Sequence, residues 1–587
     1  MKIHKFIIIF IFVLVVFISK ANADTLNQNQ QFFISSQYDI RARTSINASV
    51  RHLSDHAYFY IADDYWIGIT EADRSKVLAQ VKVLADEFDK RIYPVEIEFF
   101  GSEPNPGIDN DPRLTILLTP LIENAGGYFD VSNQHVSADV VRSNQREMIY
   151  LNISELFNQS KMFPFLAHEF QHLISYNQKE KLRNVSDDIW LNELRSEYAV
   201  TLLGYNDIYE GSHLQRRATA LLSDPEDSLT EWKNLANDYG QIGLFGEYIA
   251  EHLSPRVIAD TLNNKSSGFN SLAESLLKNG YPEHFVSIYS NWLAANFIND
   301  ASSDKKYSYL KKDLTDLRVR SSNSIVNLGD GASFVISNSI KDWQGKWYDI
   351  YQLQSGSKNV MKINFDSPSL TSFLISYFIF GNDGNYQAYE FTPSPTNKEL
   401  YISSIGTDVS RIVIIPVKKD KIAGFSYNET PINLTISFAR VSLAPVMATT
   451  IQPVKTQVLP VPVSSSNTRL NLRDGSLIRA RGDNKVYVIK GNWRRHIINS
   501  KIFSFYSGLG FERVIEVDPD ILNSYKESDF VRYAKEKKVY SVDKSGYRRW
   551  LNISGQQFSD SGRAWDSIFE INYPEYIFYK IGSDLKL

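Results

Sequence analysis

The stretch FLAHEFQHLISYN, residues 165–177, contains His168 and His172 four positions apart, with Glu169 directly after the first histidine. In an α-helix, residues at positions i and i+4 lie on the same face, one turn apart. Two imidazoles arranged in this way can bind one zinc ion, and a glutamate beside them can take a proton from a bound water. Five residues are a weak signal in a chain of 587, so the surrounding sequence must separate a zinc site from a pair of buried histidines.

A catalytic zinc site here requires a third protein ligand of a restricted type. The chain has no cysteine, so the ligand must be histidine, aspartate or glutamate. The metzincin form of the motif would have glycine at position 175 and histidine at position 178, but the chain has Ser175 and Gln178. A carboxylate from a second helix is the other solution. The stretch WLNELRSEYAV, residues 190–200, offers two glutamates one helical turn apart.

These two motifs together resemble a known family of enzymes. His168-Glu169-x-x-His172 followed by Asn192-Glu193-x-x-Ser196-Glu197 is similar to the gluzincin arrangement of thermolysin-type peptidases. The closer resemblance is to the secreted neutral zinc metallopeptidases of the hyicolysin type. It covers roughly residues 57–297, through FGSEPNPGIDNDPRLTILLTPL, GGYFD and SNQREMIYLN upstream and YGQIGLFGEYI downstream, and does not extend to the C-terminal part.

The resemblance implies a role for each motif residue. His168, His172 and Glu193 would bind zinc, and Glu169 would be the general base for a zinc-activated water. Glu197 would be a carboxylate that orients a ligand histidine, although an exchange of the roles of Glu193 and Glu197 stays open.

Three further expectations concern the substrate. Tyr239 is the first candidate for the residue that stabilises the oxyanion, and Tyr176 is the second. In such enzymes the peptide lies along an edge strand, which we expect between GGYFD and EMIYLN, residues 126–130 and 147–152. Arg195 stands where the related pattern has a small or apolar residue, so it is expected to face solvent or to tune substrate preference.

The first 23 residues have the form of a secretory signal peptide. Lys2 and Lys5 precede an apolar run, residues 6–18, and Ala21-Asn22-Ala23 fits a cleavage site after Ala23. This predicts a secreted or cell-surface protein without a transmembrane segment after signal removal. A secreted chain without cysteine fits a bacterial protein better than an animal one. Residues 24–55 are predicted to be an N-terminal segment or propeptide.

Residues 56–320 are predicted to form one α+β, zincin-like metallopeptidase domain. HAYFYIADDYW, VEIEFFG, RLTILLTPL and EMIYLN, which begin at residues 56, 95, 113 and 147, are interpreted as strands. Residues 70–94 are interpreted as a helix with Thr70 as N-cap and Asp73 at its third position. Between residues 163 and 300 the apolar periodicity is helical.

The remaining sequence divides into a sandwich, a linker and a repeat. Residues 321–443 contain seven short strand patterns and predict an all-β sandwich. Residues 444–468, rich in Pro, Thr and Ser, predict an extended linker. LIRARGDNKVYVIKGNWRRHI, from residue 477, matches FVRYAKEKKVYSVDKSGYRRWL, from residue 530, which predicts tandem small β-rich repeats at 469–525 and 526–587.

Several partner and cofactor interpretations follow. A net charge of −4 without a long basic run gives no indication of nucleic-acid binding. Asp109 and Asp111 could chelate calcium, but an ordinary turn is the favoured interpretation.

The aromatic, Arg-rich repeats could contact a glycan or a cell surface, or their aromatics could simply form small cores. The Arg481-Gly482-Asp483 tripeptide is interpreted as chance, because the second repeat has Ala-Lys-Glu there.

The sequence thus predicts a multidomain protein with an α+β zincin-like domain, an all-β sandwich and tandem repeats. The predicted function is a secreted zinc-dependent metalloendopeptidase that acts on proteins or peptides. The alternative is a cell-surface adhesion or binding protein whose metallopeptidase-like domain is inactive. An aminopeptidase is disfavoured because an acidic amine-binding motif is not evident ahead of His168.

Overall fold

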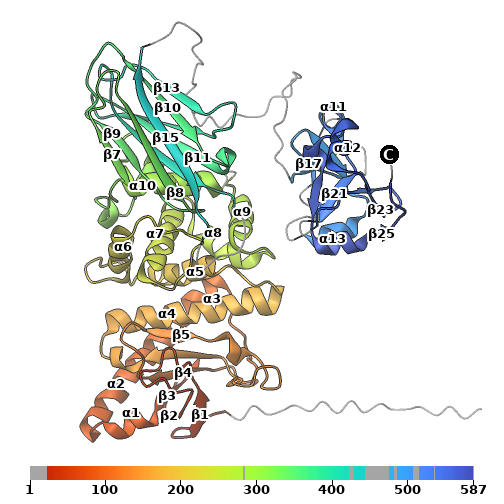
Figure 1. The fold of residues 1–587 in the computed structure, drawn as a ribbon. Coiled ribbons are helices and arrows are strands. Elements are labelled where there is room, and N and C mark those ends of the chain that lie inside the picture. The colour runs from red at the N-terminus through yellow and green to blue at the C-terminus, as the bar shows by residue number, and fades with distance from the viewer. Residues whose placement is uncertain are drawn as a thin grey trace, which may run out of the picture. The chain divides into compact units, whose positions relative to one another are not determined.

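The structure is a computed structural model that describes residues 23–281, 285–421, 429–442, 475–480, 485–506, 514–517, 519–533 and 536–585. The chain divides into two compact units, residues 1–455 and 456–587 (Figure 1). The predicted signal sequence before Ala23, the predicted linker and the Arg-Gly-Asp tripeptide lie outside the described residues. In the described part of the chain, every helix is too short or too polar to cross a membrane.

The first unit begins with a six-stranded sheet of order β1-β2-β3-β4-β6-β5. Strands β3, β4 and β6 are parallel and buried along their whole length, as expected for strands covered on both faces. Strand β5 pairs antiparallel with β6 and forms one edge. The segment 24–55 contributes β1 and β2. The strand bounds are β1 Asn29–Phe33, β2 Ser45–Leu53, β3 Ala57–Ala62, β4 Leu114–Thr119, β5 Gly127–Phe129 and β6 Met148–Asn152.

The helix predicted at residues 70–94 begins as predicted, but helical structure continues beyond residue 94 to Phe100. Helix α2 (Glu71–Glu87) has Thr70 as N-cap, whose side chain accepts a hydrogen bond from the Asp73 backbone N–H. A π-helical turn (Phe88–Ile92) joins it to α3 (Tyr93–Phe100). The strand prediction for VEIEFFG is therefore wrong. Phe88, Ile92, Glu96 and Phe100 are all buried, and this four-residue spacing is helical. The predicted strand HAYFYIADDYW also ends early, because residues 63–68 form helix α1 (Asp63–Gly68).

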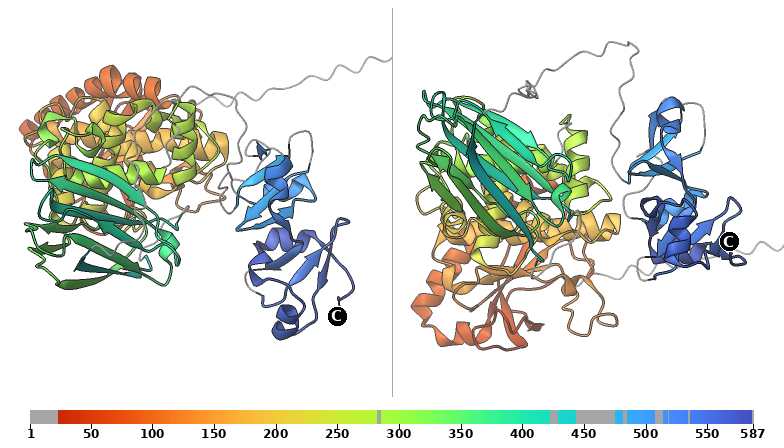
Figure 2. Two further views of the ribbon diagram at one scale, coloured as in Figure 1. Left: turned by 90° about the horizontal axis from the view of Figure 1, so that it is seen from above. Right: turned by 45° about the horizontal axis from the view of Figure 1, so that its top comes forward.

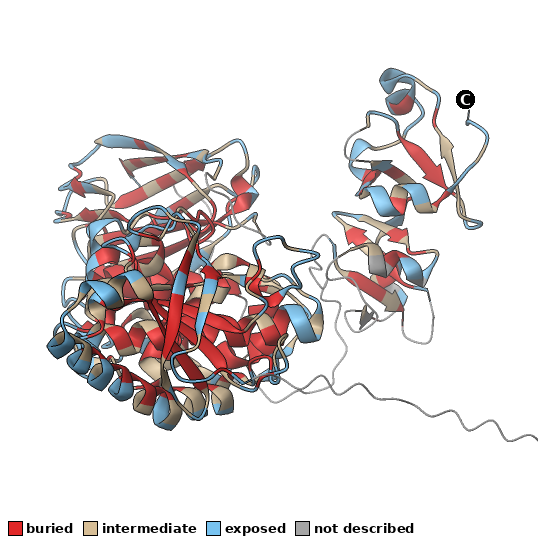
Figure 3. Cartoon of the chain, turned by 90° about the horizontal axis from the view of Figure 1, so that it is seen from below, coloured by how far each residue is buried: buried red, intermediate tan, exposed pale blue. Residues whose placement is uncertain are grey.

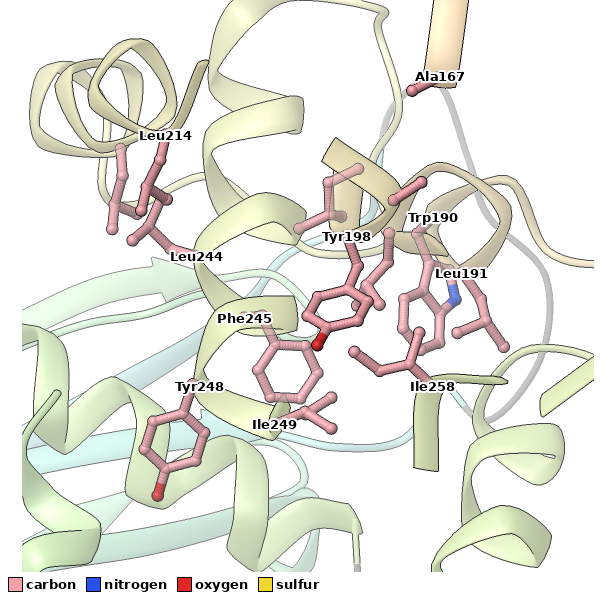
Figure 4. Close-up of a cluster of buried hydrophobic side chains, with 14 of the residues drawn as sticks. Ala167, Trp190, Leu191, Tyr198, Leu214, Leu244, Phe245, Tyr248, Ile249 and Ile258 are labelled. Atoms are coloured by element: carbon pink, nitrogen blue, oxygen red, sulfur yellow. The ribbon is translucent and has the colours of Figure 1, made fainter. Parts of the chain in front are cut away.

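Helix α4 lies between the sheet and the helical part of the first unit (Figure 1). It contacts β5 and β6 on one side and α5 on the other. Apolar residues of the sheet, of α4 and of the later helices belong to one buried cluster. Figure 4 shows part of it, with labelled side chains that include Tyr198 of α5 and Phe245 of α7. The helix bounds are α4 Gln159–Ser175, α5 Ile189–Leu202, α6 His213–Ser223, α7 Ala236–His252, α8 Pro255–Asp260, α9 Gly268–Lys278 and α10 Phe285–Phe297.

The same unit ends in a β-sandwich made of a five-stranded sheet, β12-β11-β14-β9-β7, and a four-stranded sheet, β13-β10-β15-β8. Buried side chains from both sheets form its core. The sequence missed β7 and β12, each of which has a single buried residue. The bounds are β7 Asn323–Val326, β8 Ser333–Ile340, β9 Tyr348–Tyr351, β10 Val360–Asp366, β11 Phe373–Gly381, β12 Tyr386–Phe391, β13 Glu399–Ile402, β14 Val409–Lys418 and β15 Ile432–Val441. Figure 3 shows the buried residues concentrated inside the layers of this unit.

The second unit contains two five-stranded sheets of corresponding strand order, β19-β16-β17-β18-β20 and β24-β21-β22-β23-β25 (Figure 2). Tyr487 and Tyr540, aligned in the sequence repeat, begin β17 and β22, and both are buried in small cores. The strands are β16 Leu477–Ala480, β17 Tyr487–Lys490, β18 Trp493–His496, β19 Val514–Val517, β20 Lys526–Glu527, β21 Phe530–Tyr533, β22 Tyr540–Val542, β23 Tyr547–Trp550, β24 Phe569–Ile571 and β25 Lys580–Ile581. The helices are α11 Pro519–Asn523, α12 Gly555–Asp560 and α13 Tyr573–Phe578.

Candidate metal centre

Three side chains from two helices converge at one point. His168 and His172 lie on the same face of α4, and their Nε2 atoms are 3.2 Å apart. Oε2 of Glu193, from α5, lies 3.2 Å from Nε2 of His168 and 3.5 Å from Nε2 of His172. Among the described residues, these three form the group of histidines and carboxylates that lie close enough together to hold a metal ion.

The triangle formed by these atoms fits a tetrahedral ion. Zinc binds histidine nitrogen and carboxylate oxygen at about 2.0–2.2 Å, which places neighbouring tetrahedral ligand atoms about 3.3–3.6 Å apart. The observed separations of 3.2, 3.2 and 3.5 Å are close to this spacing. Burial tends to raise the pKa of Glu193, but His172 and His168 outweigh this effect and lower the pKa to about 2.

The other ring nitrogen of each histidine has a partner from α5. Nδ1 of His172 lies 3.1 Å from the Ser196 hydroxyl and 3.4 Å from Oδ1 of Asn192. Nδ1 of His168 lies 3.4 Å from Oε1 of Glu197. Such contacts fix the ring orientation and leave Nε2 available to a metal. Asn192 and Ser196 are part of the sequence motif, but sequence reasoning gave them no role.

Glu197 is itself held by two side chains from α6, the guanidinium of Arg217 and the imidazole of His213. Arg217 donates from Nε to Oε2 and from Nη2 to Oε1, both at 2.7 Å, and Nε2 of His213 lies 2.7 Å from Oε2. Burial would raise the pKa of Glu197, but Arg217 and His213 hold it well below its usual range. Sequence reasoning missed both partners. The sequence pattern that could have indicated them is their i, i+4 spacing on one face of an amphipathic helix.

Glu169 lies beneath the edge strand β5, where the strand comes very close to the helix. A Cβ atom on Gly127 would lie 3.0 Å from Cγ of Glu169 and 2.7 Å from the backbone oxygen of Tyr150. The backbone N–H of Phe129 donates a hydrogen bond to the Glu169 carboxylate, while burial raises the pKa of this residue. Strand β5 is thus the edge that the sequence predicted, and glycine allows it to approach Glu169.

If the peptidase activity expected from the sequence is present, Gly127→Ala should lower it by at least about 10-fold, because the added methyl group must displace Glu169 or the β5–β6 pairing. Zinc content should stay near the wild-type value, since the three converging side chains do not contact this glycine. Gly68→Ala is the matched control, because a Cβ there meets nothing within 4 Å. Steady-state kinetics with a quenched peptide and metal analysis provide the measurement. Wild-type activity in Gly127→Ala would contradict the assigned close approach.

Of the two tyrosine candidates, Tyr239 lies nearer to the converging ligands. Its ring centroid is 6.3 Å from that of His168, and the Arg217 guanidinium stacks 4.6 Å from its ring centroid. The Tyr239 hydroxyl donates to Oδ1 of Asn234 at 2.7 Å. Tyr176 follows α4 and contacts the rings of Phe129 and His135.

Tyr38, which sequence reasoning missed, also lies near the centre. It stacks on Tyr128 with ring centroids 4.7 Å apart. Burial raises its pKa, a hydrogen bond with the Asn234 side chain lowers it, and the carboxylates of Glu169 and Glu193 raise it. Because Tyr38 belongs to the segment 24–55, this segment contributes to the surroundings of the candidate centre as well as to the sheet.

The structure decides two further interpretations, those of Arg195 and of the Asp109–Asp111 turn. Arg195 is fully buried and donates from Nη2 to Asp187 at 2.7 Å, so the expectation that it faces solvent is wrong. The carboxylates of Asp109 and Asp111 accept backbone hydrogen bonds from residues two positions later, at 3.0 and 2.9 Å. Asp111 also accepts from the Tyr58 hydroxyl at 2.7 Å. These contacts fit a turn and give calcium no support.

A pair of buried carboxyl groups lies at the start of α7. Asp238 accepts a hydrogen bond from the Leu235 backbone N–H at 2.7 Å. Burial and the neighbouring Asp238 raise the pKa of Asp227 to about 7. In the unfolded chain Asp227 should ionise near its usual pKa of about 4, so folding opposes its ionisation. The protein therefore loses stability as the pH rises from about 4 to about 7, and the loss is complete above pH 7.

We expect Asp227→Asn to raise the free energy of unfolding at about pH 8 by on the order of 2 kcal/mol, because it removes this penalty. The difference from wild type should shrink as the pH falls toward about 4, where wild-type Asp227 is protonated in both states. Denaturant unfolding of both proteins at several pH values measures this difference in the free energy of unfolding. Asp64→Asn, a change at a more exposed carboxylate on α1, is the control. An Asp227→Asn effect that grows at low pH would contradict the prediction.

Comparison with known proteins identifies a distant metalloprotease relative. No family model matches the chain. Over 276 residues the chain is 23% identical to the neutral metalloprotease ShpI of Staphylococcus hyicus, and the match covers 42% of this chain and 59% of that protein. The chain thus spans less than two thirds of the length of this curated relative.

Two solved structures from Clostridium perfringens are also similar to parts of the chain. The M60 catalytic domain of ZmpB with its CBM51 domains has 10% identity and a TM-score of 0.23, and covers 68% of this chain and 60% of that one. The catalytic module of the metalloprotease ZmpA has 10% identity and a TM-score of 0.22, and covers 61% and 66%. These scores support no statement about the fold. The sequence similarity to ShpI is that of a distant relative.

Proposed function

We propose that this protein is a secreted zinc-dependent metalloendopeptidase. The observation that carries the proposal is the convergence of His168, His172 and Glu193 beside Glu169, under the edge strand β5. A secreted or cell-surface location rests on the N-terminal sequence, which has the form of a signal peptide. The distant similarity to a neutral metalloprotease agrees with this function.

In this proposal His168, His172 and Glu193 bind the zinc. The ion supplies a Lewis acid that makes water a nucleophile near neutral pH. Glu169 accepts the proton of the attacking water and passes it to the leaving amine. Burial favours such proton transfer because it raises the pKa of Glu169 toward the working pH. Glu197 holds His168 in place through its Nδ1 atom.

The substrate would bind as an extended strand. Strand β5 is paired with β6 on one side only, so its other side can pair with a peptide backbone. This would bring a peptide carbonyl over Glu169, with Tyr239 as the hydroxyl donor to the oxyanion. The C-terminal sheets would hold the enzyme on a cell surface or on a glycan-bearing substrate.

The test is the metal content of residues 24–587, combined with cleavage of casein and of quenched peptides. We expect about one zinc per chain and activity that a chelator removes and added zinc restores. His172→Ala should lose both properties, whereas His52→Ala, a change at a distant histidine in strand β2, should lose neither. Absence of zinc would overturn the site. Zinc without cleavage of any substrate would favour the binding-protein alternative.

A further inference from the structure

The Tyr239 hydroxyl is oriented by a side chain from the loop that precedes its helix. This α6–α7 loop comprises residues 224–235. The hydroxyl donates to Oδ1 of Asn234 at 2.7 Å. Asn234 has a positive φ of 61°, a left-handed conformation that asparagine and glycine adopt more easily than other residues. The backbone of the loop and the direction of the Tyr239 hydroxyl are therefore linked at one residue.

The α6–α7 loop is attached to the β-sandwich by backbone contacts. The Ser228 hydroxyl donates to the backbone oxygen of Asp342 at 2.6 Å, and the Leu229 N–H donates to the backbone oxygen of Trp343 at 3.0 Å. Gln344 Nε2 donates to the backbone oxygen of Glu226 at 2.6 Å. These three sandwich residues belong to the connection between β8 and β9.

A buried carboxylate strengthens this attachment. Glu231 is 1% exposed and accepts hydrogen bonds from Lys233 in the loop and from Lys341 in the sandwich, both at 2.6 Å. It also accepts from the backbone N–H of Glu429 at 2.8 Å, a second sandwich segment. A carboxylate buried among such partners is costly to disturb, so it fixes the loop relative to the sandwich.

The sandwich connection also enters the core of the helical part. Trp343 is 3% exposed, and its ring centroid lies 4.6 Å from that of Phe269 and 5.0 Å from that of Phe285. On the other side of the loop, Trp232 packs edge-on against Tyr239 with centroids 5.1 Å apart. The sandwich and Tyr239 are thus joined through one continuous set of packed and hydrogen-bonded groups.

We propose that Asn234 is a positioning residue for Tyr239, and that the β-sandwich keeps it in place through the α6–α7 loop. The sandwich is then a part of the catalytic apparatus as well as a separate layer of the fold. This inference rests on the proposed function, in which Tyr239 donates to the oxyanion. Asn234 does not touch the reacting atoms, and it acts by directing the hydroxyl that does.

The first test separates the side chain of Asn234 from its backbone. Asn234→Gly keeps the left-handed conformation but removes the acceptor, whereas Asn234→Asp keeps an acceptor for the hydroxyl. In the full chain we expect Asn234→Gly to lower kcat about 10-fold with KM within about two-fold of wild type, and Asn234→Asp to lower kcat much less. Asn234 also hydrogen-bonds Tyr38, so the double mutant is compared in a Tyr38→Phe background. In that background, adding Asn234→Gly to Tyr239→Phe should cause no further loss. Independent, multiplicative losses would overturn the proposal.

A second test reads the position of Tyr239 without activity. With 3-fluorotyrosine at position 239, the ¹⁹F resonance should shift or broaden in Asn234→Gly and in Glu231→Gln. It should be unchanged in the control Glu210→Gln, an exposed carboxylate before α6. An unchanged resonance in the first two variants would overturn the positioning role. If wild type cleaves nothing while its zinc is bound, the proposed function fails and this measurement still decides the role of Asn234.

Discussion

Glu169→Gln is expected to lower kcat for peptide hydrolysis by about 10³-fold, while the protein keeps its zinc. Glutamine has the size of glutamate but cannot accept the proton of the attacking water. Glu169 does not belong to the group of converging ligand atoms, so the metal should stay bound. The backbone N–H of Phe129 can still donate to the amide oxygen, which should keep the local structure intact.

The measurement is single-turnover and steady-state cleavage of a quenched peptide, with zinc determined on the same preparations. Glu155→Gln, a change just before α4 at a carboxylate that forms an ion pair with Lys161, is the control and should keep wild-type activity. Loss of zinc in Glu169→Gln would indicate a ligand or structural role instead. Activity within about 10-fold of wild type would exclude Glu169 as the general base.

The second large effect distinguishes the two glutamates of α5. Glu193→Gln should abolish zinc binding at equimolar metal, because it removes the anionic donor from the convergent set. Glu197→Gln should keep zinc with an affinity about 10–100-fold lower, since Glu197 contacts His168 through the nitrogen that faces away from the other two ligands.

Glu197→Gln should also destabilise the fold, which Glu193→Gln should do much less. Arg217 and His213 would lose the buried carboxylate that both contact, and such a loss costs about 3–5 kcal/mol. Chelator competition gives the zinc affinity, and denaturant unfolding of the metal-free proteins gives the stability. If Glu197→Gln abolished zinc binding and Glu193→Gln only weakened it, Glu197 would be the third ligand.

Local periodicity predicted that His168 and His172 share a helix face, whereas Glu193 was expected from the family resemblance, with Glu197 as the alternative. A spacing of four residues in one helix fixes the relative positions of His168 and His172 before any tertiary contact forms. To place the glutamate of the second helix beside them, only the packing of α4 on α5 must also be known. The pattern of EMIYLN predicted a strand, and the family resemblance placed the edge strand between GGYFD and EMIYLN.

The sequence could not reveal residues that reach the centre from distant segments. Arg217, Tyr38 and Asn234 come from three separate parts of the chain, and each has an ordinary local context. The strand prediction for VEIEFFG failed for a related reason. Its alternating apolar residues suit a strand locally, but the preceding helix continues through a π-helical turn and aligns Glu96 and Phe100 with Phe88.

The shortness of β5 has a consequence for the substrates of the proposed enzyme. The strand has three residues and one free side, so a bound peptide must expose an extended backbone of similar length. Helices and paired strands of a folded protein do not offer such a backbone until they open. Where opening is fast relative to cleavage, the cleavage rate follows the equilibrium population of the open segment. The same enzyme would then digest unfolded chains readily and spare stable proteins that contain identical sequences.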